Sequence, residues 1–372
     1  STARLTFSPT ALSSDAFYIA GMRVADAFIG LELKDRFYAV ASPLELGNFR
    51  KYSHCDKVFS LSDLQSALPA GATYAHLIAL AAKKIGARKI LVGDDFPAGL
   101  YTQLKKLIPT NISKGPLFPE RLIKSREAQN EIRKANKICA EGIALCADLL
   151  HRSRVSKNKL LLGGETLTSE LLRKRVQALF LQRGLEPLSE LIIAGGAQGC
   201  DPHCLGFGPL KPRELIIVDL FAPLEASHYW GDMTRTFLKG TPSPAQVKLV
   251  TTVLAAQREA VKSIRPGIDG QKIHERIVER FSAAGFKTKK TSRGYEGFFH
   301  GTGHSLGLDC HDLGRHGKGI HSRKNILRSG EVYTVEPGLY YPAIGGCRIE
   351  DNGVVTRTGF ELLSRAPYTW QV

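Results

Sequence analysis

The 372-residue sequence has no apolar run of the roughly 20 residues that a membrane-spanning helix needs, and no cleavable secretory signal is visible at its start. Its seven cysteines are an odd number without CxxC pairs. Cys200 and Cys204 flank His203, but no second ligand pair accompanies them, so buried free thiols explain them better than zinc. We therefore expect reduced thiols, a cytoplasmic protein and no membrane association.

Acidic residues are scarce beside basic ones, with 35 Asp and Glu against 51 Lys and Arg and a net charge of +16. Such an excess can attract nucleic acid or anionic surfaces. The basic residues nevertheless form short, scattered clusters without interleaved aromatic residues, so a solvated surface is the simpler interpretation and nucleic acid is not the expected partner. A hydrophobic content of 43% and this length indicate a globular chain with room for two domains.

Two aspartates lie in segments that otherwise read as buried strands. Asp219 interrupts the apolar run 215–221, and Asp232 lies in a second strand-like segment, 229–237. Alone, either would more often pair with an arginine such as Arg235. An antiparallel pair would bring the two carboxylates close together, however, and buried carboxylates need a cation, a metal ion or several donors.

Three further residues extend this group. His304 lies in a glycine-rich stretch, 300–312, in which extended chain fits better than helix, and the glycines could admit a substrate backbone. Glu336 ends a strand-like run directly before Pro337. Glu350 follows Arg348 by two positions, so in a strand both face the same way and could simply pair.

Four carboxylates and one imidazole make an oxygen-rich set that suits two divalent ions better than a single zinc. Mutual repulsion among the carboxylates makes such a cluster stable only when cations neutralise it. Two ions roughly 3.5 to 4 Å apart, with a bridging hydroxide as nucleophile, are the arrangement of two-metal hydrolases. Hydrolysis of an amide or ester is the chemistry that follows.

Five segments also carry a resemblance to a known family. They are VD at 218–219, GDMTRT at 231–236, HGTGH at 300–304, TVEPG at 334–338 and RIED at 348–351. Their order resembles that of the pita-bread metallopeptidases, which include methionine aminopeptidase, Xaa-Pro aminopeptidase, prolidase and the metal-free creatinase. The resemblance runs from about position 125 to the end of the chain, and the additional N-terminal region points to the Xaa-Pro aminopeptidase and prolidase branch.

The resemblance implies a role for each matching residue. Asp219 would chelate one ion, Asp232 and Glu350 would bridge both ions, and His304 and Glu336 would bind the other. Glu336 would also act as the general base.

Four further residues match the family pattern. His203 would stabilise the substrate or the tetrahedral intermediate, and His300 and His311 would position the scissile carbonyl and the residue after it. Arg348 would orient the carboxylates. The connection from Asp219 to Asp232 is two residues longer than is usual in the family, so the rim of the site could differ.

We predict an α+β chain in two parts: a creatinase-like α/β domain at 1–122 and a pita-bread catalytic domain at 123–372, with a curved antiparallel sheet and outer helices. In the first part, strands are expected at 17–20, 27–31, 37–41 and 89–92, and helices at 75–85 and 98–107. In the second part, helices are expected at 125–150, 165–183, 243–264 and 269–284.

The leading functional hypothesis is a metal-dependent exopeptidase of the Xaa-Pro aminopeptidase type, which releases the residue before proline from a peptide. The alternative is a prolidase limited to Xaa-Pro dipeptides, with Arg315 or Arg323 binding the substrate carboxylate. A hydrolase of small amides or esters, or a non-catalytic nucleic-acid or protein-binding member of the fold, would be other outcomes. We expect manganese, with cobalt or zinc as alternatives, and a homodimer, as is common among the relatives.

Overall fold

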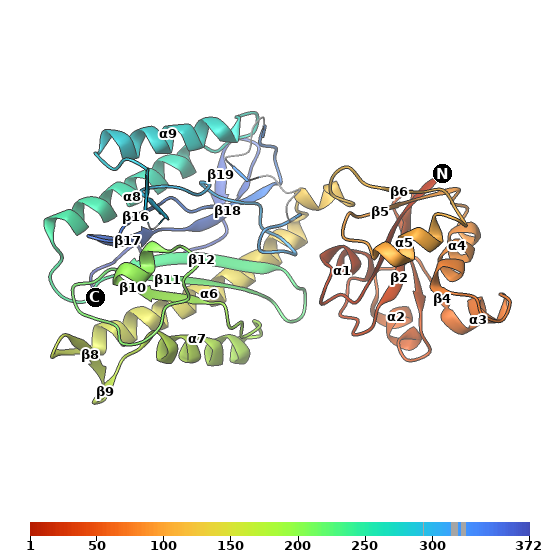
Figure 1. Cartoon of the computed structure of the whole chain (residues 1–372), viewed down its shortest axis with the longest axis horizontal. Coiled ribbons are helices and arrows are strands. Elements are labelled where there is room, and N and C mark those ends of the chain that lie inside the picture. Colours follow the sequence, from red (N-terminus) through yellow and green to blue (C-terminus); the bar gives the residue numbers. More distant parts are fainter. Residues whose placement is uncertain (293, 314–318, 321–324) are drawn as a thin grey trace. The chain divides into compact units, whose positions relative to one another are not determined.

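The computed structural model describes residues 1–292, 294–313, 319–320 and 325–372 (Figure 1). These residues form two compact units, Ser1–Glu120 and Arg121–Val372. The boundary between the units follows Glu120, two residues before the expected boundary after position 122 (122 − 120 = 2).

The first unit is built on a six-stranded mixed sheet of order β4-β3-β2-β1-β5-β6. Its strands are β1 (Thr2–Ser8), β2 (Phe28–Leu33), β3 (Arg36–Ala41), β4 (Lys57–Ser60), β5 (Lys89–Val92) and β6 (Thr110–Ile112). Its helices are α1 (Ser14–Ala20), α2 (Leu46–Tyr52), α3 (Leu61–Ser66), α4 (Tyr74–Lys84) and α5 (Ala98–Leu104). The α/β character expected of this part is thus confirmed.

The prediction of a strand at 17–20 was wrong, because this apolar run lies in helix α1. The Ser13 side chain accepts a hydrogen bond from the Ala16 amide and caps the helix, and Gly21 ends it in the left-handed conformation with φ 66°. Two other boundaries differ by more than two residues. Helix α5 ends at Leu104 rather than 107, and Thr168 caps helix α7 so that it begins at Ser169 rather than 165.

The second unit has four long helices around several small antiparallel sheets. The helices are α6 (Arg126–Arg152), α7 (Ser169–Arg183), α8 (Pro244–Ser263) and α9 (Gly270–Ala283). The strands that matter for the site are β10 (Ile192–Gly195), β11 (Ile216–Pro223), β12 (Trp230–Phe237), β15 (Val332–Val335), β16 (Gly338–Tyr341), β17 (Gly345–Arg348) and β18 (Asp351–Val355). The others are β7 (Arg154–Ser156), β8 (Lys159–Leu162), β9 (Glu165–Thr166), β13 (Lys289–Thr291), β14 (Gly294–Glu296) and β19 (Phe360–Leu362).

Each half of this unit pairs helices with its own strands (Figure 1). One apolar core combines α6 and α7 with β10, β11 and β12, and a second combines α8 and α9 with β15, β16 and β17. Hydrogen bonds join the halves at strand β12. The Glu350 amide donates to the Thr234 carbonyl over 3.0 Å, and the Thr236 hydroxyl donates to the Arg348 carbonyl over 2.9 Å.

Strand β12 approaches helix α6 so closely at Gly231 that no side chain fits there. A Cβ at this position would lie 2.7 Å from the backbone carbon of Ala135 and 2.8 Å from the amide nitrogen of Asn136. We expect Gly231→Ala to lower the free energy of unfolding by about 1–3 kcal/mol, the usual effect of overpacking. Urea unfolding should show this loss, whereas Gly359→Ala, which adds a Cβ with no neighbour within 4 Å, should not. Equal losses in both variants would contradict the packing argument.

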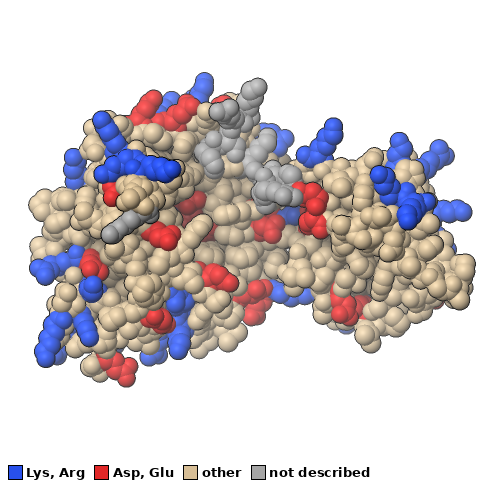
Figure 2. Space-filling model, viewed as in Figure 1, with Lys and Arg blue, Asp and Glu red and all other residues tan. Residues whose placement is uncertain are grey.

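Within the described ranges, no helix combines the length and apolarity needed to cross a membrane. On the face of the larger unit seen in Figure 2, Lys and Arg side chains lie mostly along its outline, while several Asp and Glu side chains lie nearer its middle.

Candidate metal centre

The two aspartates lie on one hairpin, as the sequence predicts. Strands β11 and β12 pair antiparallel, with Asp219 opposite Thr234 and Phe221 opposite Asp232. Opposed residues share a sheet face, so the two carboxylates project on the same side as diagonal neighbours. They are 8% and 3% exposed, respectively.

Arg235 does not pair with either aspartate. Its guanidinium donates to Asp351 Oδ1 over 2.8 Å. The simple alternative of an Arg235 salt bridge to Asp219 or Asp232 is thereby excluded.

His304 reaches the site from an extended segment that lies against β15. The Thr334 amide donates to the His304 carbonyl, and the Glu336 amide donates to the Thr302 carbonyl, both over 2.8 Å. A Cβ at Gly303 would lie 1.9 Å from the Thr334 carbonyl oxygen, so this glycine allows the segment to contact β15. Gly307 similarly packs against Asp312. The expectation that these two glycines admit a substrate backbone was therefore wrong.

Four of the candidate ligands converge on one small region. His304 Nε2 lies 3.6 Å from Asp232 Oδ2 and 3.5 Å from Glu336 Oε1. The ligating atoms of Asp232, His304 and Glu350 all lie within 4.8 Å of one another. The structure thus brings together a histidine and three carboxylates from β12, the segment before β15, the end of β15 and the segment after β17.

The tautomer of His304 indicates that a cation belongs between these groups. Its Nδ1 lies 3.2 Å from the Ser305 carbonyl, which can only accept, so Nδ1 carries the proton. Burial lowers the pKa of His304 to about 3, which keeps the ring neutral. Nε2 therefore turns a lone pair toward the acceptor oxygens of Asp232 and Glu336, an arrangement that a metal ion would make favourable.

The pKa values of the carboxylates also indicate that a cation belongs among them. Burial, followed by repulsion from Asp219 and Glu336, raises the pKa of Asp232. Burial and the charge of Asp232 raise the pKa of Glu350, and burial raises the pKa of Glu336 to about 7 although Arg348 opposes it. Divalent ions would reverse these shifts by holding all the groups ionised.

Asp219 supplies the most direct test of fit for a metal ion. Its Oδ2 accepts a hydrogen bond from Arg348 Nη2 over 2.6 Å, so Arg348 pairs with this residue rather than with Glu350. Its Oδ1 is buried and has no hydrogen-bond partner among the described residues. A buried carboxylate oxygen without a donor is rare, and a cation ligated by Oδ1 would satisfy it. The donor set therefore fits divalent metal ions.

Polar residues from α6, β12 and β18 hold Asp232 and Glu350 in place. Asn136 Oδ1 accepts a hydrogen bond from the Asp232 amide over 3.0 Å, and Asn352 Nδ2 donates to the Asp232 carbonyl over 2.8 Å. The Thr234 hydroxyl donates to Glu350 Oε2 over 2.6 Å. All three side chains are buried.

His300 connects to Arg348 through Tyr340, which sequence reasoning did not single out. Arg348 Nη1 donates to the Tyr340 hydroxyl over 2.9 Å, and this hydroxyl lies 2.8 Å from His300 Nε2. His300 Nδ1 lies 2.8 Å from the Gly301 carbonyl and so carries the proton. The Tyr340 hydroxyl therefore donates to His300 Nε2, and both ring nitrogens of His300 are engaged within the protein.

The other two candidate histidines lie on exposed positions near the ligands. His203 follows Pro202, whose carbonyl accepts a hydrogen bond from Arg348 Nη2 over 3.4 Å. The ring centroid of His311 lies 4.1 Å from that of His304. Partial desolvation of the ring and the charge of His203 lower the pKa of His311, although Asp219 opposes them.

A buried ion network anchors the loop that carries His311. Asp312 Oδ2 accepts from Lys124 Nζ and Asp312 Oδ1 accepts from Arg121 Nη2, both over 2.6 Å. The Ser305 hydroxyl also donates to the Asp312 carbonyl over 2.6 Å. These contacts hold the chain from Ser305 to Asp312 in a closed loop, which fixes His311 beside His304. Arg315 and Arg323, the candidate carboxylate-binding residues, lie outside the described residues.

Replacing Tyr340 by Phe should leave Arg348 Nη1 and His300 Nε2 without their shared partner. We expect the free energy of unfolding to fall by about 1–3 kcal/mol, the usual effect of unpairing a buried polar group. Tyr341→Phe is the matched control, because its hydroxyl donates to the Lys287 carbonyl at an exposed position. Thermal unfolding should separate the two variants, and indistinguishable melting temperatures would count against the Tyr340 link.

Comparisons with known proteins give a consistent picture. The model of metallopeptidase family M24 matches residues 130–357, which include all five candidate ligands. The chain is 29% identical over 288 residues to a Xaa-Pro dipeptidase of Pyrococcus horikoshii, a match that covers 75% of this chain and 74% of that protein.

Solved structures show the same fold. The X-Pro aminopeptidase of Thermotoga maritima aligns with a TM-score of 0.79 at 19% identity, over 100% of this chain and 97% of that one. The prolidase of Pyrococcus horikoshii aligns with a TM-score of 0.75 at 24% identity, over 98% and 94% of the respective chains. These alignments confirm the two-part, pita-bread architecture.

Proposed function

Because the chain belongs to metallopeptidase family M24, we propose that it is a metal-dependent exopeptidase that hydrolyses the bond between a residue and a following proline. The single observation that carries this proposal is the convergence of Asp232, His304, Glu336 and Glu350 around one region, beside the unsatisfied Oδ1 of Asp219. A non-catalytic binding protein would not need these metal-ligating groups to lie together.

The five residues Asp219, Asp232, His304, Glu336 and Glu350 would hold two divalent ions, with Asp232 and Glu350 shared between them. The oxygen-rich donor set favours manganese. Bound ions would polarise the scissile carbonyl and lower the pKa of a water molecule.

Each side chain around the ions would then have a separate role in the reaction. Glu336 would take the proton from the attacking water, because its carboxylate lies in the cluster, 3.5 Å from His304 Nε2, and bound ions would keep it ionised. Arg348 would hold Asp219 in place through its 2.6 Å contact. His311 and His203 would bind the substrate carbonyl. His300 would keep Tyr340 and Arg348 oriented, because both of its ring nitrogens are already engaged.

Between the two expected substrate classes, the comparisons favour the dipeptidase. The relative named above is a Xaa-Pro dipeptidase, and a prolidase is among the structural neighbours. We therefore place Xaa-Pro dipeptides first, with a carboxylate-binding role for Arg315 or Arg323, and peptides that begin Xaa-Pro second. The second class has support from the likeness to the X-Pro aminopeptidase.

The test is an assay of Mn²⁺-loaded protein on Ala-Pro and on Ala-Pro-Ala, with free alanine measured by chromatography. A dipeptidase releases alanine from Ala-Pro and leaves the tripeptide intact, whereas an aminopeptidase cleaves the tripeptide. The Xaa-Pro assignment fails if neither substrate is cleaved while Ala-Ala or Ala-Ala-Ala is.

A further inference from the structure

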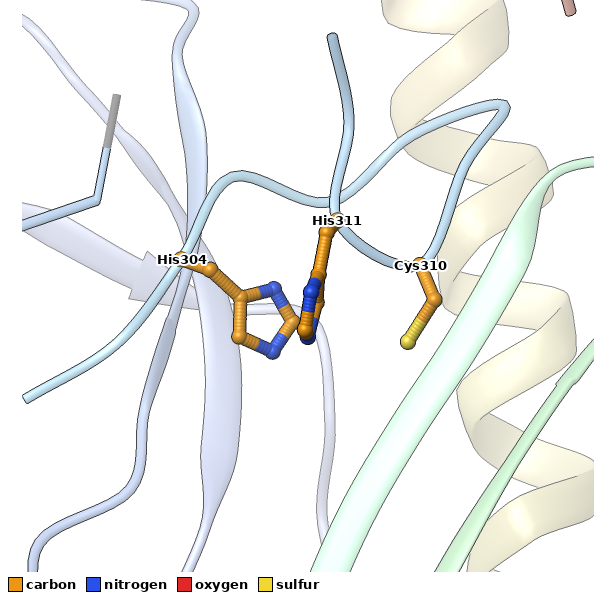
Figure 3. A group of neighbouring side chains, drawn as sticks. All are labelled: His304, Cys310 and His311. Atoms are coloured by element: carbon orange, nitrogen blue, oxygen red, sulfur yellow. The ribbon is translucent and has the colours of Figure 1, made fainter. Parts of the chain in front are cut away.

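A thiol lies at the edge of the carboxylate cluster and is not among the five ligands. Cys310 Sγ contacts Asp232 Oδ2 at 3.4 Å. Ligating atoms of His304, Cys310 and His311 all lie within 4.8 Å of one another. Figure 3 shows these three side chains directed to the same region, with the His311 ring between the His304 ring and the Cys310 thiol.

This group has a different chemistry from the carboxylate cluster beside it. Two imidazoles and one thiol form a soft donor set, which suits Zn²⁺ or Cd²⁺, whereas carboxylates suit Mn²⁺. Asp232 Oδ2, close to both Cys310 and His304, offers a fourth donor, and four donors of this kind satisfy the tetrahedral preference of zinc.

The placement of the three donors is fixed by the fold. The ion contacts of Asp312 with Lys124 and Arg121 anchor the loop that carries Cys310 and His311. His304 is held against β15 by the hydrogen bond that the Thr334 amide donates to its carbonyl. Contacts within the protein thus gather the donors in one place.

We propose that His304, Cys310 and His311, with Asp232 beside them, form a second cation-binding mode selective for thiophilic divalent ions. It rests on the proposed function only in that His304 and Asp232 are shared with the carboxylate site. On binding, the S–H bond of Cys310 breaks, the sulfur bonds the cation, and the proton leaves to the buffer. Because the two modes share ligands, a thiophilic ion in this mode excludes the Mn²⁺ pair and removes His311 from the substrate.

The proposal is tested with Cd²⁺ and Co²⁺ alone, added to metal-free protein. Wild type should show a thiolate-to-metal charge-transfer band in the ultraviolet. Cys310→Ser should lack the band, and the ratio of its Cd²⁺ affinity to its Mn²⁺ affinity should fall by at least about 10-fold, the lower end of what loss of a supporting residue costs a metal site. The control is Cys55→Ser, which removes a half-buried thiol of the first unit and should leave the band intact. Circular dichroism establishes that each variant is folded.

A second readout is inhibition of the Mn²⁺-loaded enzyme by excess Cd²⁺, which should weaken in Cys310→Ser. The proposal is overturned if wild type shows no thiolate band, or if the band persists in folded Cys310→Ser. If the band is absent while Mn²⁺-dependent cleavage of Ala-Pro is intact, only this inference fails. If the band is present without any peptidase activity, the proposed function fails and the cation site stands.

Discussion

Glu336→Gln should abolish Ala-Pro hydrolysis almost completely while leaving the protein folded. The glutamate side chain lies 3.5 Å from His304 Nε2, and bound ions would keep it ionised and able to accept a proton. Removing a general base costs about 10²–10⁴-fold in rate. Glutamine is also a weaker metal ligand than glutamate, so we expect kcat to fall by the upper end of that range.

The control for this variant must change a carboxylate of similar size away from the cluster. Glu361→Gln serves, because Glu361 forms an exposed ion pair with Arg133 at 3.0 Å. Its kcat should equal that of wild type. Substantial turnover by folded, Mn²⁺-loaded Glu336→Gln would refute the assigned role.

Metal-free protein should lose stability as the pH rises from about 4.5 to about 7. The pKa of Glu336 is raised by burial from 4.5 to about 7, so the folded state binds its proton more tightly than the unfolded state does. The associated stability is therefore fully present below pH 4.5 and is lost as the pH rises through 7. A shift of this size corresponds to a loss on the order of 3 kcal/mol. Asp232 and Glu350, whose pKa values are also raised, add to the loss.

The measurement is urea unfolding between pH 5 and 8, with and without chelator. Because Gln does not ionise, metal-free Glu336→Gln should lose less stability over this range than metal-free wild type. Saturating Mn²⁺ should restore stability at pH 8, since the ions bind the ionised carboxylates. A metal-free wild type that is equally stable at pH 5 and pH 8, or a Glu336→Gln variant with the same pH slope, would contradict this electrostatic account.

The closeness of the two aspartates was predictable because each interrupts the pattern of a buried strand. A charged residue inside the apolar run of β11 needs a partner. Strand alternation then places Asp219 and Asp232 on one face of the sheet. The long helices were predictable for a similar reason, since their apolar periodicity and caps agree, as for α6 with its Ser125 cap.

The supporting residues were not predictable, because nothing local distinguishes them. Asn136 lies in the middle of α6 and Tyr340 in β16, and each acquires its role only when the fold brings it to Asp232 or Arg348. Cys310 is another example, since its sequence setting fits a buried free thiol and its contact with Asp232 spans 78 positions. Short capped runs such as 17–20 also mislead, because four apolar residues fit a strand or a helix turn equally well.

The Mn²⁺ content of dialysed protein, measured by elemental analysis, tests the central claim most directly. The proposed site predicts two ions per wild-type chain and fewer than one in Asp232→Asn, because Asp232 is proposed as a ligand of both ions. The Glu361→Gln control should keep two. Wild type without bound Mn²⁺, or Asp232→Asn with the wild-type content, would contradict the assignment of these residues as a metal centre.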